Sequence, residues 1–204
     1  MDRFQKIVWG GLVAALVAIG VIYFLSATRR SPLPVISQVH PFAATNQLGE
    51  AVGADALRGH VSVVNVIFSR CPTQCPKLTQ QMARVQAAVG PGVRLLTLTA
   101  DPGYDTPEVL KRYAQRNGAD PAKWWFLTGS KAEIYRLAVS DLKFSVLESA
   151  NPAEAKLEDL FIHTTDFAIV DRAGRLRTVV HGEEPDAPAQ IVALVKQLQR
   201  ETSL

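Results

Sequence analysis

The chain's only two cysteines, Cys71 and Cys75, are the residues most clearly placed to do chemistry. They follow the apolar, β-branched run of residues 61–68, which predicts a strand buried on both faces, and they open a predicted helix over residues 74–89. Ligand sites in open α/β sheets lie at the carboxyl ends of such strands. A helix N-terminus and Arg70 both favour the thiolate, the species that attacks disulfides and binds metals.

The spacing of the two cysteines leaves two kinds of chemistry open. If the first helical turn contains both, a separation of four places the two sulfurs on one helix face. Three residues intervene, where thioredoxin-type oxidoreductases have two, and the wider spacing suits chelation of a soft ion such as Cu(I). A structural disulfide or two buried free thiols is the alternative, but so small a disulfide loop would stabilise the fold little. We therefore expect a redox-active pair or a metal site.

A third donor would complete a trigonal copper site, and the chain offers four histidines: His40, His60, His163 and His181. His163 directly precedes a predicted strand over residues 165–171, whereas His60 lies at the opposite end of the first central strand from Cys71. Any one of them could instead be a surface or hydrogen-bonded histidine, so spacing alone does not choose among them.

Two carboxylates, Asp101 and Asp105, follow the next predicted buried strand, over residues 93–100. They would lie at the same edge of the sheet as the cysteines and could support a metal site from its second layer. The neighbouring Pro102 and Pro107 favour the alternative, that both residues serve turn and capping chemistry.

The elements that must position these residues alternate along the chain. A short hairpin over residues 38–44 and 50–52 is expected first. Strands are then predicted at residues 61–68, 93–100, 165–171 and 175–181, with a short strand or loop at 124–129, and helices at 74–89, 107–117, 130–139 and 187–200. This order predicts an α/β fold, a three-layer sandwich of the thioredoxin type.

The N-terminus carries a separate signal. Residues 7–27 are 21 consecutive residues without a charge, enough to span about 31 Å as one transmembrane helix. A cleaved signal peptide is the alternative, but the apolar run is longer than the usual one. We expect a membrane anchor over residues 1–30, a linker over 31–37 and one domain over 38–204.

The formal net charge of +3 belongs wholly to residues 1–30, because the acidic and basic side chains of residues 31–204 balance. This balance excludes a basic nucleic-acid-binding domain. The side of the membrane on which the domain lies does not follow from the charges that flank the apolar run.

Four segments resemble the SCO/SenC family in order and spacing. They are residues 64–76 with the Cys-Pro-x-x-Cys-Pro motif, 101–110 with Asp-Pro-x-x-Asp-Thr-Pro, 124–129 and 163–171. The resemblance covers about residues 36–200 and implies a thioredoxin-like domain that binds a copper ion through Cys71, Cys75 and His163. The polar stretch 148–162 departs from the compact turn of many members and predicts a loop before His163.

The resemblance also implies a function and a location. Members help build the binuclear copper site of cytochrome c oxidase subunit II, so we expect a copper metallochaperone on the periplasmic, extracytoplasmic side of the inner (plasma) membrane, anchored by a single pass. A thiol reductant is implied, because a disulfide would abolish copper binding. The alternative is a thiol–disulfide oxidoreductase, with Cys71 as the catalytic attacking thiolate and Cys75 resolving, that acts on an oxidase subunit or another extracytoplasmic protein. A peroxidase is a third possibility that no other feature selects.

Overall fold

The computed structural model describes residues 32–150 and 161–201, together with residues 2, 9, 11, 12 and 15–20; the side chains of residues 162 and 163 are not among those described. The chain divides into two compact units, Met1–Pro32 and Leu33–Leu204. In the first unit, residues 15–20 are helical. Within the described part of the chain, no helix is both long enough and apolar enough to cross a membrane. Most of the predicted anchor, residues 7–27, lies outside the described residues.

An eight-stranded mixed sheet organises the second unit, in the order β1-β10-β9-β4-β5-β6-β2-β3. Its centre is the parallel trio β4 (Val61–Ile67), β5 (Val93–Thr99) and β6 (Trp124–Thr128). All seven residues of β4 are buried, as the continuous apolar run predicts. The flanking strands, all antiparallel to their neighbours, are β9 (Asp166–Val170), β10 (Arg175–His181), β1 (Ser37–Gln38), β2 (Ala43–Asn46) and β3 (Ala51–Gly53).

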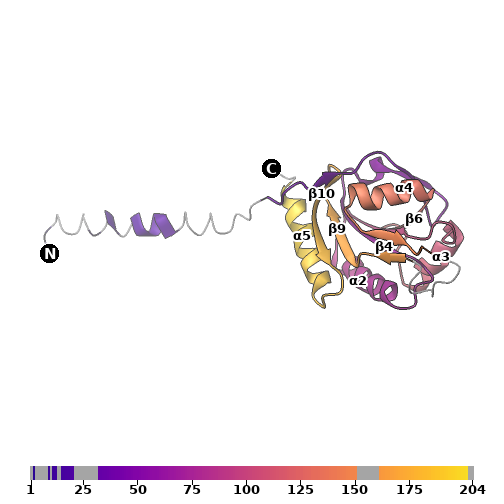
Figure 1. The fold of residues 1–204 in the computed structure, drawn as a ribbon. Coiled ribbons are helices and arrows are strands. Elements are labelled where there is room, and N and C mark those ends of the chain that lie inside the picture. Colours follow the sequence, from indigo (N-terminus) through magenta and orange to yellow (C-terminus); the bar gives the residue numbers. More distant parts are fainter. Residues whose placement is uncertain are drawn as a thin grey trace. The chain divides into compact units, whose positions relative to one another are not determined.

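Helices cover both faces of this sheet (Figure 1). Three lie along one face: α2 (Gln74–Ala88), α3 (Pro107–Arg116) and α5 (Ala187–Glu201). Two successive right-handed crossovers place α2 and α3 on the same side, where a 2.8 Å hydrogen bond joins the hydroxyls of Thr79 and Tyr113. The other face carries α4 (Lys131–Tyr135) and the π-helical turn η2 (Arg136–Asp141). The prediction of a three-layer α/β fold of thioredoxin type is confirmed.

Several elements differ from the prediction. A small second sheet joins β7 (Val146–Glu148) to β8 (Phe161–His163), where the sequence predicts only a loop over residues 148–162. Residues 151–160 of that predicted loop lie outside the described residues. The first hairpin is β2 and β3 and begins later than expected, because residues 37–38 pair with β10 instead. A short 3₁₀ helix, η1 (Ala54–Leu57), follows it.

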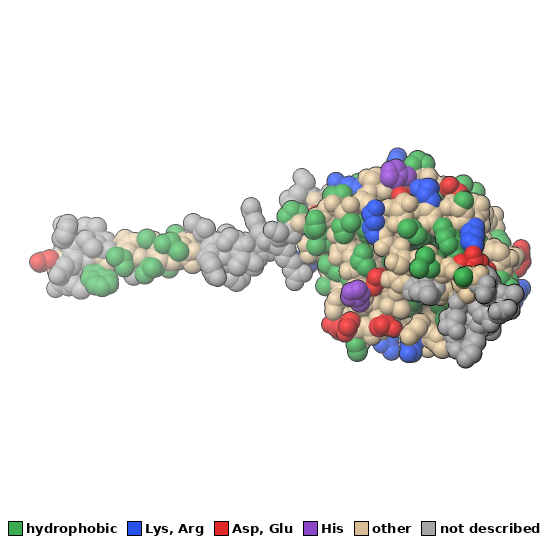
Figure 2. Space-filling model, in the orientation of Figure 1, with side chains coloured by type: hydrophobic (Ala, Val, Ile, Leu, Met, Phe, Trp, Pro, Cys, Tyr) green, Lys and Arg blue, Asp and Glu red, His purple; other side chains and the backbone are tan. Residues whose placement is uncertain are grey.

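The face of the domain drawn in Figure 2 carries acidic and basic side chains that are interspersed. Apolar side chains are scattered between them (Figure 2). Such a mixed surface is ordinary for a globular domain.

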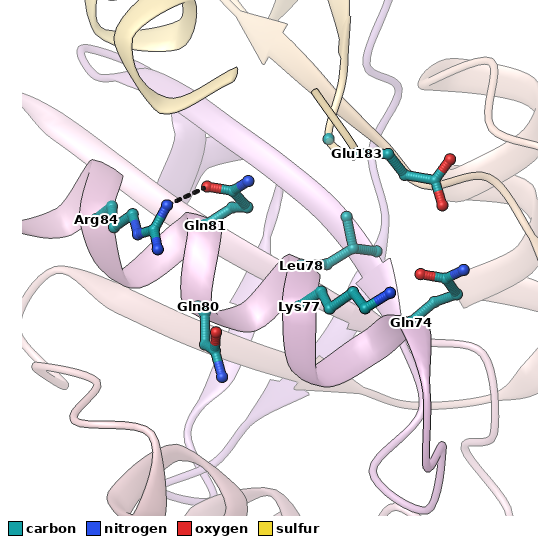
Figure 3. A pocket seen from close by; sticks show the side chains of 8 residues that line it. Gln74, Lys77, Leu78, Gln80, Gln81, Arg84 and Glu183 are labelled. Carbon is teal, nitrogen blue, oxygen red and sulfur yellow. Dashed lines mark hydrogen bonds between the residues drawn. The ribbon is translucent and has the colours of Figure 1, made fainter. Parts of the chain in front are cut away.

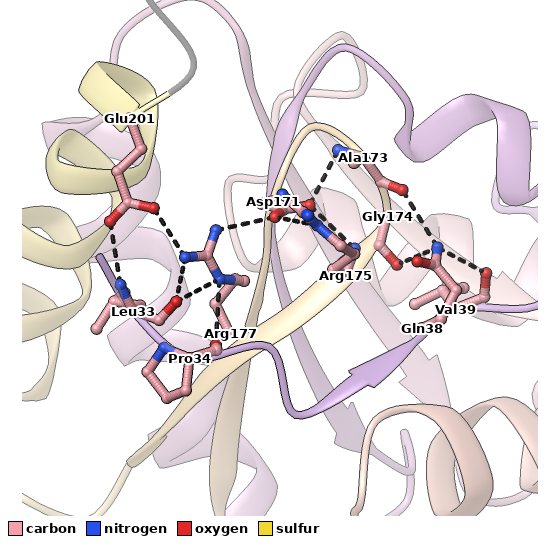
Figure 4. Close-up of polar contacts among 10 residues, drawn as sticks. All are labelled: Leu33, Pro34, Gln38, Val39, Asp171, Ala173, Gly174, Arg175, Arg177 and Glu201. Carbon is pink, nitrogen blue, oxygen red and sulfur yellow. Dashed lines mark hydrogen bonds and ion pairs between the residues drawn. The ribbon is translucent and has the colours of Figure 1, made fainter. Parts of the chain in front are cut away.

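Arg177 links the first residues of the domain to its C-terminal helix, α5 (Figure 4). Its guanidinium, 6% exposed, pairs with Asp171 at 3.0 Å and with Glu201 of α5 at 2.8 Å. It also donates to the backbone oxygens of Leu33 and Pro34. Part of the segment predicted as a linker, residues 31–37, is therefore hydrogen bonded into the compact unit, which begins at Leu33.

Removing this buried guanidinium would take the cation from Glu201 and leave Asp171 with the exposed Arg175 as its remaining cationic partner. We expect Arg177→Ala to lower the free energy of unfolding by about 3–5 kcal/mol. Arg175→Ala is the matched control, because Arg175 pairs with the same Asp171 at 2.8 Å from a 43% exposed position, and we expect it to cost less than about 1 kcal/mol. Denaturant unfolding measures both, and equal losses would contradict the assigned role of Arg177.

Candidate metal centre

The two cysteines lie at the junction between the end of β4 and the start of α2, at the carboxyl edge of the sheet. The backbone N–H of Cys71 donates to the Phe68 carbonyl at 3.1 Å, which closes a turn directly after the strand. Helix α2 begins at Gln74 with Thr73 as its N-cap, so Cys75 lies in the first turn and Cys71 precedes the helix. The shared helical face considered from the spacing is therefore not how the sulfurs meet.

The structure nevertheless brings the two sulfurs together through that turn. No disulfide joins the two cysteines, and both are buried, with Cys71 8% exposed and Cys75 wholly enclosed. The thiol of Cys75 shares a hydrogen bond with the sulfur of Cys71. The Phe68 N–H donates to the Cys75 sulfur at 3.5 Å, and the Thr73 hydroxyl lies 3.9 Å from the Cys71 sulfur.

These contacts make the two thiols unlike one another. The hydrogen bond from Cys75 lowers the pKa of Cys71 from 9.0 to about 4, against the effect of burial. The same hydrogen bond, together with burial, raises the pKa of Cys75. The reduced pair therefore holds one thiolate, on the more accessible sulfur, and one protonated thiol.

A buried carboxylate, Asp105, holds the loop that carries Cys71. It accepts a hydrogen bond from the Ser69 N–H at 3.1 Å, another from the Ser69 hydroxyl, and a third from the Thr99 hydroxyl at 2.5 Å. Burial raises its pKa. Since Ser69 follows β4 and Thr99 ends β5, Asp105 links the ends of two neighbouring strands.

Asp101 holds the same loop from a second point. Its carboxylate pairs with Arg70 at 2.5 Å, and the Arg70 guanidinium lies 4.1 Å from the centre of the Tyr104 ring. The side-chain cap of α3 is supplied instead by Thr106, which accepts from the Val109 N–H. The carboxylates of Asp101 and Asp105 thus contact the two residues preceding Cys71, which the spacing did not reveal.

The strand that carries His163 lies beside this loop. The ring of Phe161 in β8 packs against the ring of Phe68, with centroids 5.2 Å apart. The backbone of His163 pairs with Val146, but its side chain lies outside the described residues. In the part of the chain that the structure describes, no three histidine, cysteine or acidic side chains are grouped so that they could hold a metal ion.

The other three histidines take different places. His60 lies at the opposite edge and its ring nitrogen contacts the Arg58 carbonyl at 3.1 Å. His40 contacts Asp141 at 2.8 Å. His181 contacts Asp166 at 2.5 Å and, at the end of β10, lies on the cysteine edge of the sheet.

The chemistry of this donor set suits a soft monovalent ion. Two sulfurs within hydrogen-bonding reach, one already a thiolate, match the preference of Cu(I) for thiolate ligands. The same pair could exchange with a disulfide, since a stabilised thiolate beside a second thiol is the arrangement that thiol–disulfide exchange uses.

The fold and the paired thiols define a thioredoxin-like α/β protein with its cysteines at the strand–helix junction. Residues 33–200 match the SCO1/SenC family model, and the chain belongs to that family. It is 31% identical to the SCO1 protein homolog of Bacillus subtilis over 192 residues, which cover 91% of this chain and 94% of the relative.

Solved structures of the family have the same fold. BsSco, a member of the Sco family of cytochrome c oxidase assembly proteins in which a disulfide switch was identified, superposes with a TM-score of 0.68 at 27% identity, over 82% of this chain and 98% of that one. Yeast Sco1 with copper bound superposes with a TM-score of 0.61 at 26% identity, over 78% and 89% of the two chains.

The asymmetry of the two thiols can be measured by titration. We expect the ultraviolet absorbance of the reduced, metal-free protein to show one thiolate at neutral pH, lost as the pH falls through about 4. Because the unfolded thiol titrates near 9.0, the folded state binds one proton fewer between these values. The free energy of unfolding should therefore increase as the pH rises across that window. This increase is lost again as the pH falls to about 4.

Two variants show whether Cys75 causes the shift. Cys75→Ala removes the main hydrogen bond to the thiolate, so it should return the Cys71 pKa toward 9.0. Thr73→Ala removes a weaker contact to the same sulfur and should move the pKa much less. A Cys71 pKa near 9.0 in the unaltered protein would refute the assignment.

Proposed function

We propose that this protein is a copper metallochaperone, in which Cys71, Cys75 and His163 bind Cu(I) and pass it to an acceptor. The observation that carries the proposal is the pair of reduced, hydrogen-bonded sulfurs at the strand–helix junction. The packing of Phe161 on Phe68 supports the third ligand, since β8 runs from Phe161 to His163 beside the cysteine loop. The copper-bound structure of yeast Sco1 supports the choice of metal.

Copper transfer would proceed by exchange of ligands without a change in oxidation state. Cu(I) binds the Cys71 thiolate, Cys75 releases its proton to solvent as it becomes the second thiolate ligand, and the imidazole of His163 completes a trigonal site. Thiolates of the acceptor then replace these ligands one at a time. A disulfide between Cys71 and Cys75 has no thiolate to offer, so a thiol reductant must keep the pair reduced.

The acceptor that we propose is subunit II of cytochrome c oxidase, whose binuclear copper site this protein would help to assemble. Support comes from BsSco, a member of a family of cytochrome c oxidase assembly proteins. A membrane-bound acceptor also fits a chaperone tethered to the same membrane.

A second function is favoured by one specific observation, the lowered pKa of Cys71 beside a protonated Cys75. That pair could reduce a disulfide in an oxidase subunit. Cys71 would attack one sulfur to form a mixed disulfide, and Cys75, after losing its proton, would then attack Cys71 and release the substrate as a dithiol. The disulfide switch identified in BsSco is consistent with this role.

Anaerobic Cu(I) titration of the full-length protein in detergent, against a competing chelator, separates the two functions. We expect one tightly bound copper per chain, and at least about a tenfold loss of affinity in Cys71→Ser, Cys75→Ser or His163→Ala. His60→Ala is the control, because this histidine lies at the opposite edge of the sheet. If His163→Ala binds copper like the unaltered protein and still reduces disulfides, the oxidoreductase becomes the better assignment.

We also propose that residues 1–30 hold the protein in the inner membrane by a single pass, with the domain on the periplasmic side. The 21-residue uncharged run supports the membrane span, and the resemblance to the SCO/SenC family implies the periplasmic side. Alkaline phosphatase fused to the C-terminus should be active, and the full-length chain should stay in the membrane fraction after a carbonate wash. Deletion of residues 7–27 should abolish both results. A shortened chain released from the membrane would instead indicate a cleaved signal peptide.

A further inference from the structure

We propose that His181, held by Asp166, is an additional copper ligand at which the ion binds before it reaches the two cysteines. This inference rests on the proposed copper-binding function and adds to it a route of entry. It comes from a histidine that the cysteine and His163 site does not use.

The topology of the sheet places His181 at the edge where the cysteines lie. Strand β9 runs antiparallel to β4, so the first residues of β9 are near the carboxyl end of β4. Strand β10 runs antiparallel to β9, and its last residue, His181, pairs with Asp166. The end of β10 and the loop that follows β4 therefore share one edge.

The ring of His181 is oriented as metal-binding histidines usually are. Its Nδ1 lies 2.5 Å from an Asp166 oxygen, and Asp166 also accepts a hydrogen bond from the Thr164 hydroxyl. A proton on Nδ1, shared with the carboxylate, leaves the lone pair of Nε2 for a metal. The side chain is 80% exposed, so an ion can reach Nε2 from solvent.

The backbone after His181 is fixed against the helix that carries Cys75. The Gly182 N–H donates to the Thr165 carbonyl at 2.9 Å. A Cβ at Gly182 would lie 2.4 Å from that oxygen and 2.6 Å from Cδ2 of Leu78, so only glycine fits without movement. Since Leu78 is three residues beyond Cys75 in α2, Gly182 brings the end of β10 onto the first turns of that helix.

A groove of about 220 Å³ runs along α2 and is lined in part by Gly182 and Glu183, the two residues that follow His181 (Figure 3). Gly182 and Glu183 line one side, and Gln74, which precedes Cys75, lines the other. Lys77 and Arg84 also line it, and their positive charges oppose a cation inside the groove. His181 itself does not line the groove, so we assign the copper ligand to His181 and assign no ion to the groove.

Such a position would hold copper briefly. One imidazole supported by a carboxylate binds Cu(I) more weakly than two thiolates do, so the ion moves on to Cys71 and Cys75 without a change in oxidation state. Among the residues described, no set of three ligands forms around His181.

The chain contains a matched control for this histidine. His40 also contacts a carboxylate through Nδ1, that of Asp141 at 2.8 Å, and its side chain is 67% exposed. It follows β1, which pairs with the beginning of β10, so it lies toward the edge opposite His181. If exposure and a hydrogen bond to an aspartate were enough for copper binding, His40 and His181 would both bind copper. A route to the cysteines requires His181 but not His40.

The first experiment observes the ligand directly. In a full-length Cys71→Ser, Cys75→Ser protein with labelled histidines, a small amount of Cu(II) should broaden the ring NMR signals of His181. Removal of the thiols prevents reduction of the Cu(II) probe. A His181 ring signal that stays sharp would overturn the proposal.

The second experiment tests the route. Transfer of Cu(I) from a small chelator to the reduced, full-length protein should be severalfold slower in His181→Ala, with the equilibrium affinity for copper unchanged. His40→Ala should load at the rate of the unaltered protein. If His181→Ala loads at that rate too, the route is refuted although the chaperone function stands. If the unaltered protein binds no Cu(I) through its thiols, the proposed function itself fails.

Discussion

The geometry of the candidate site depends on one buried carboxylate, that of Asp105. Its hydrogen bonds to Ser69 and Thr99 connect the ends of β4 and β5, so the loop leading to Cys71 cannot shift relative to the sheet without breaking them. A carboxylate enclosed by protein is costly unless its oxygens are satisfied, and here donors from both strand ends satisfy it. The hydrogen bonds that Asp105 requires therefore also fix the loop that positions the thiols.

The same carboxylate acts on the chemistry of the pair. Its negative charge contributes to the raised pKa of Cys75, as does the thiolate of Cys71. The reduced, metal-free site therefore carries one negative charge on Cys71 and a second one nearby on Asp105. These two charges disfavour a third charge on Cys75. A metal cation removes that resistance, because its positive charge allows Cys75 to lose its proton.

Much of this fold could be predicted from the sequence, because its main elements have strong local signals. The apolar run of β4, the Thr106–Pro107 start of α3 and the turn between β9 and β10 all lie where the residue patterns place them. Sheet β7–β8 could not be found in this way, since strands of three residues have too little periodicity to stand out. The bonds of Arg177 to Leu33 and Glu201 were also hidden, because they join residues far apart in the sequence.

The features of the site also differ in whether they could be predicted from neighbouring residues in the sequence or only from contacts between distant ones. The position of the cysteines after a strand could be read from neighbouring residues, but the contacts of Asp101 and Asp105 with the cysteine loop required the register of β4 and β5. His181 shows the point most clearly. Its sequence neighbours say nothing of metal binding, and its relation to the cysteines follows only from two antiparallel pairings, β4 with β9 and β9 with β10. Because those pairings place the ends of three strands at one edge, residues that are 110 positions apart, Cys71 and His181, come to lie at the same edge of the sheet.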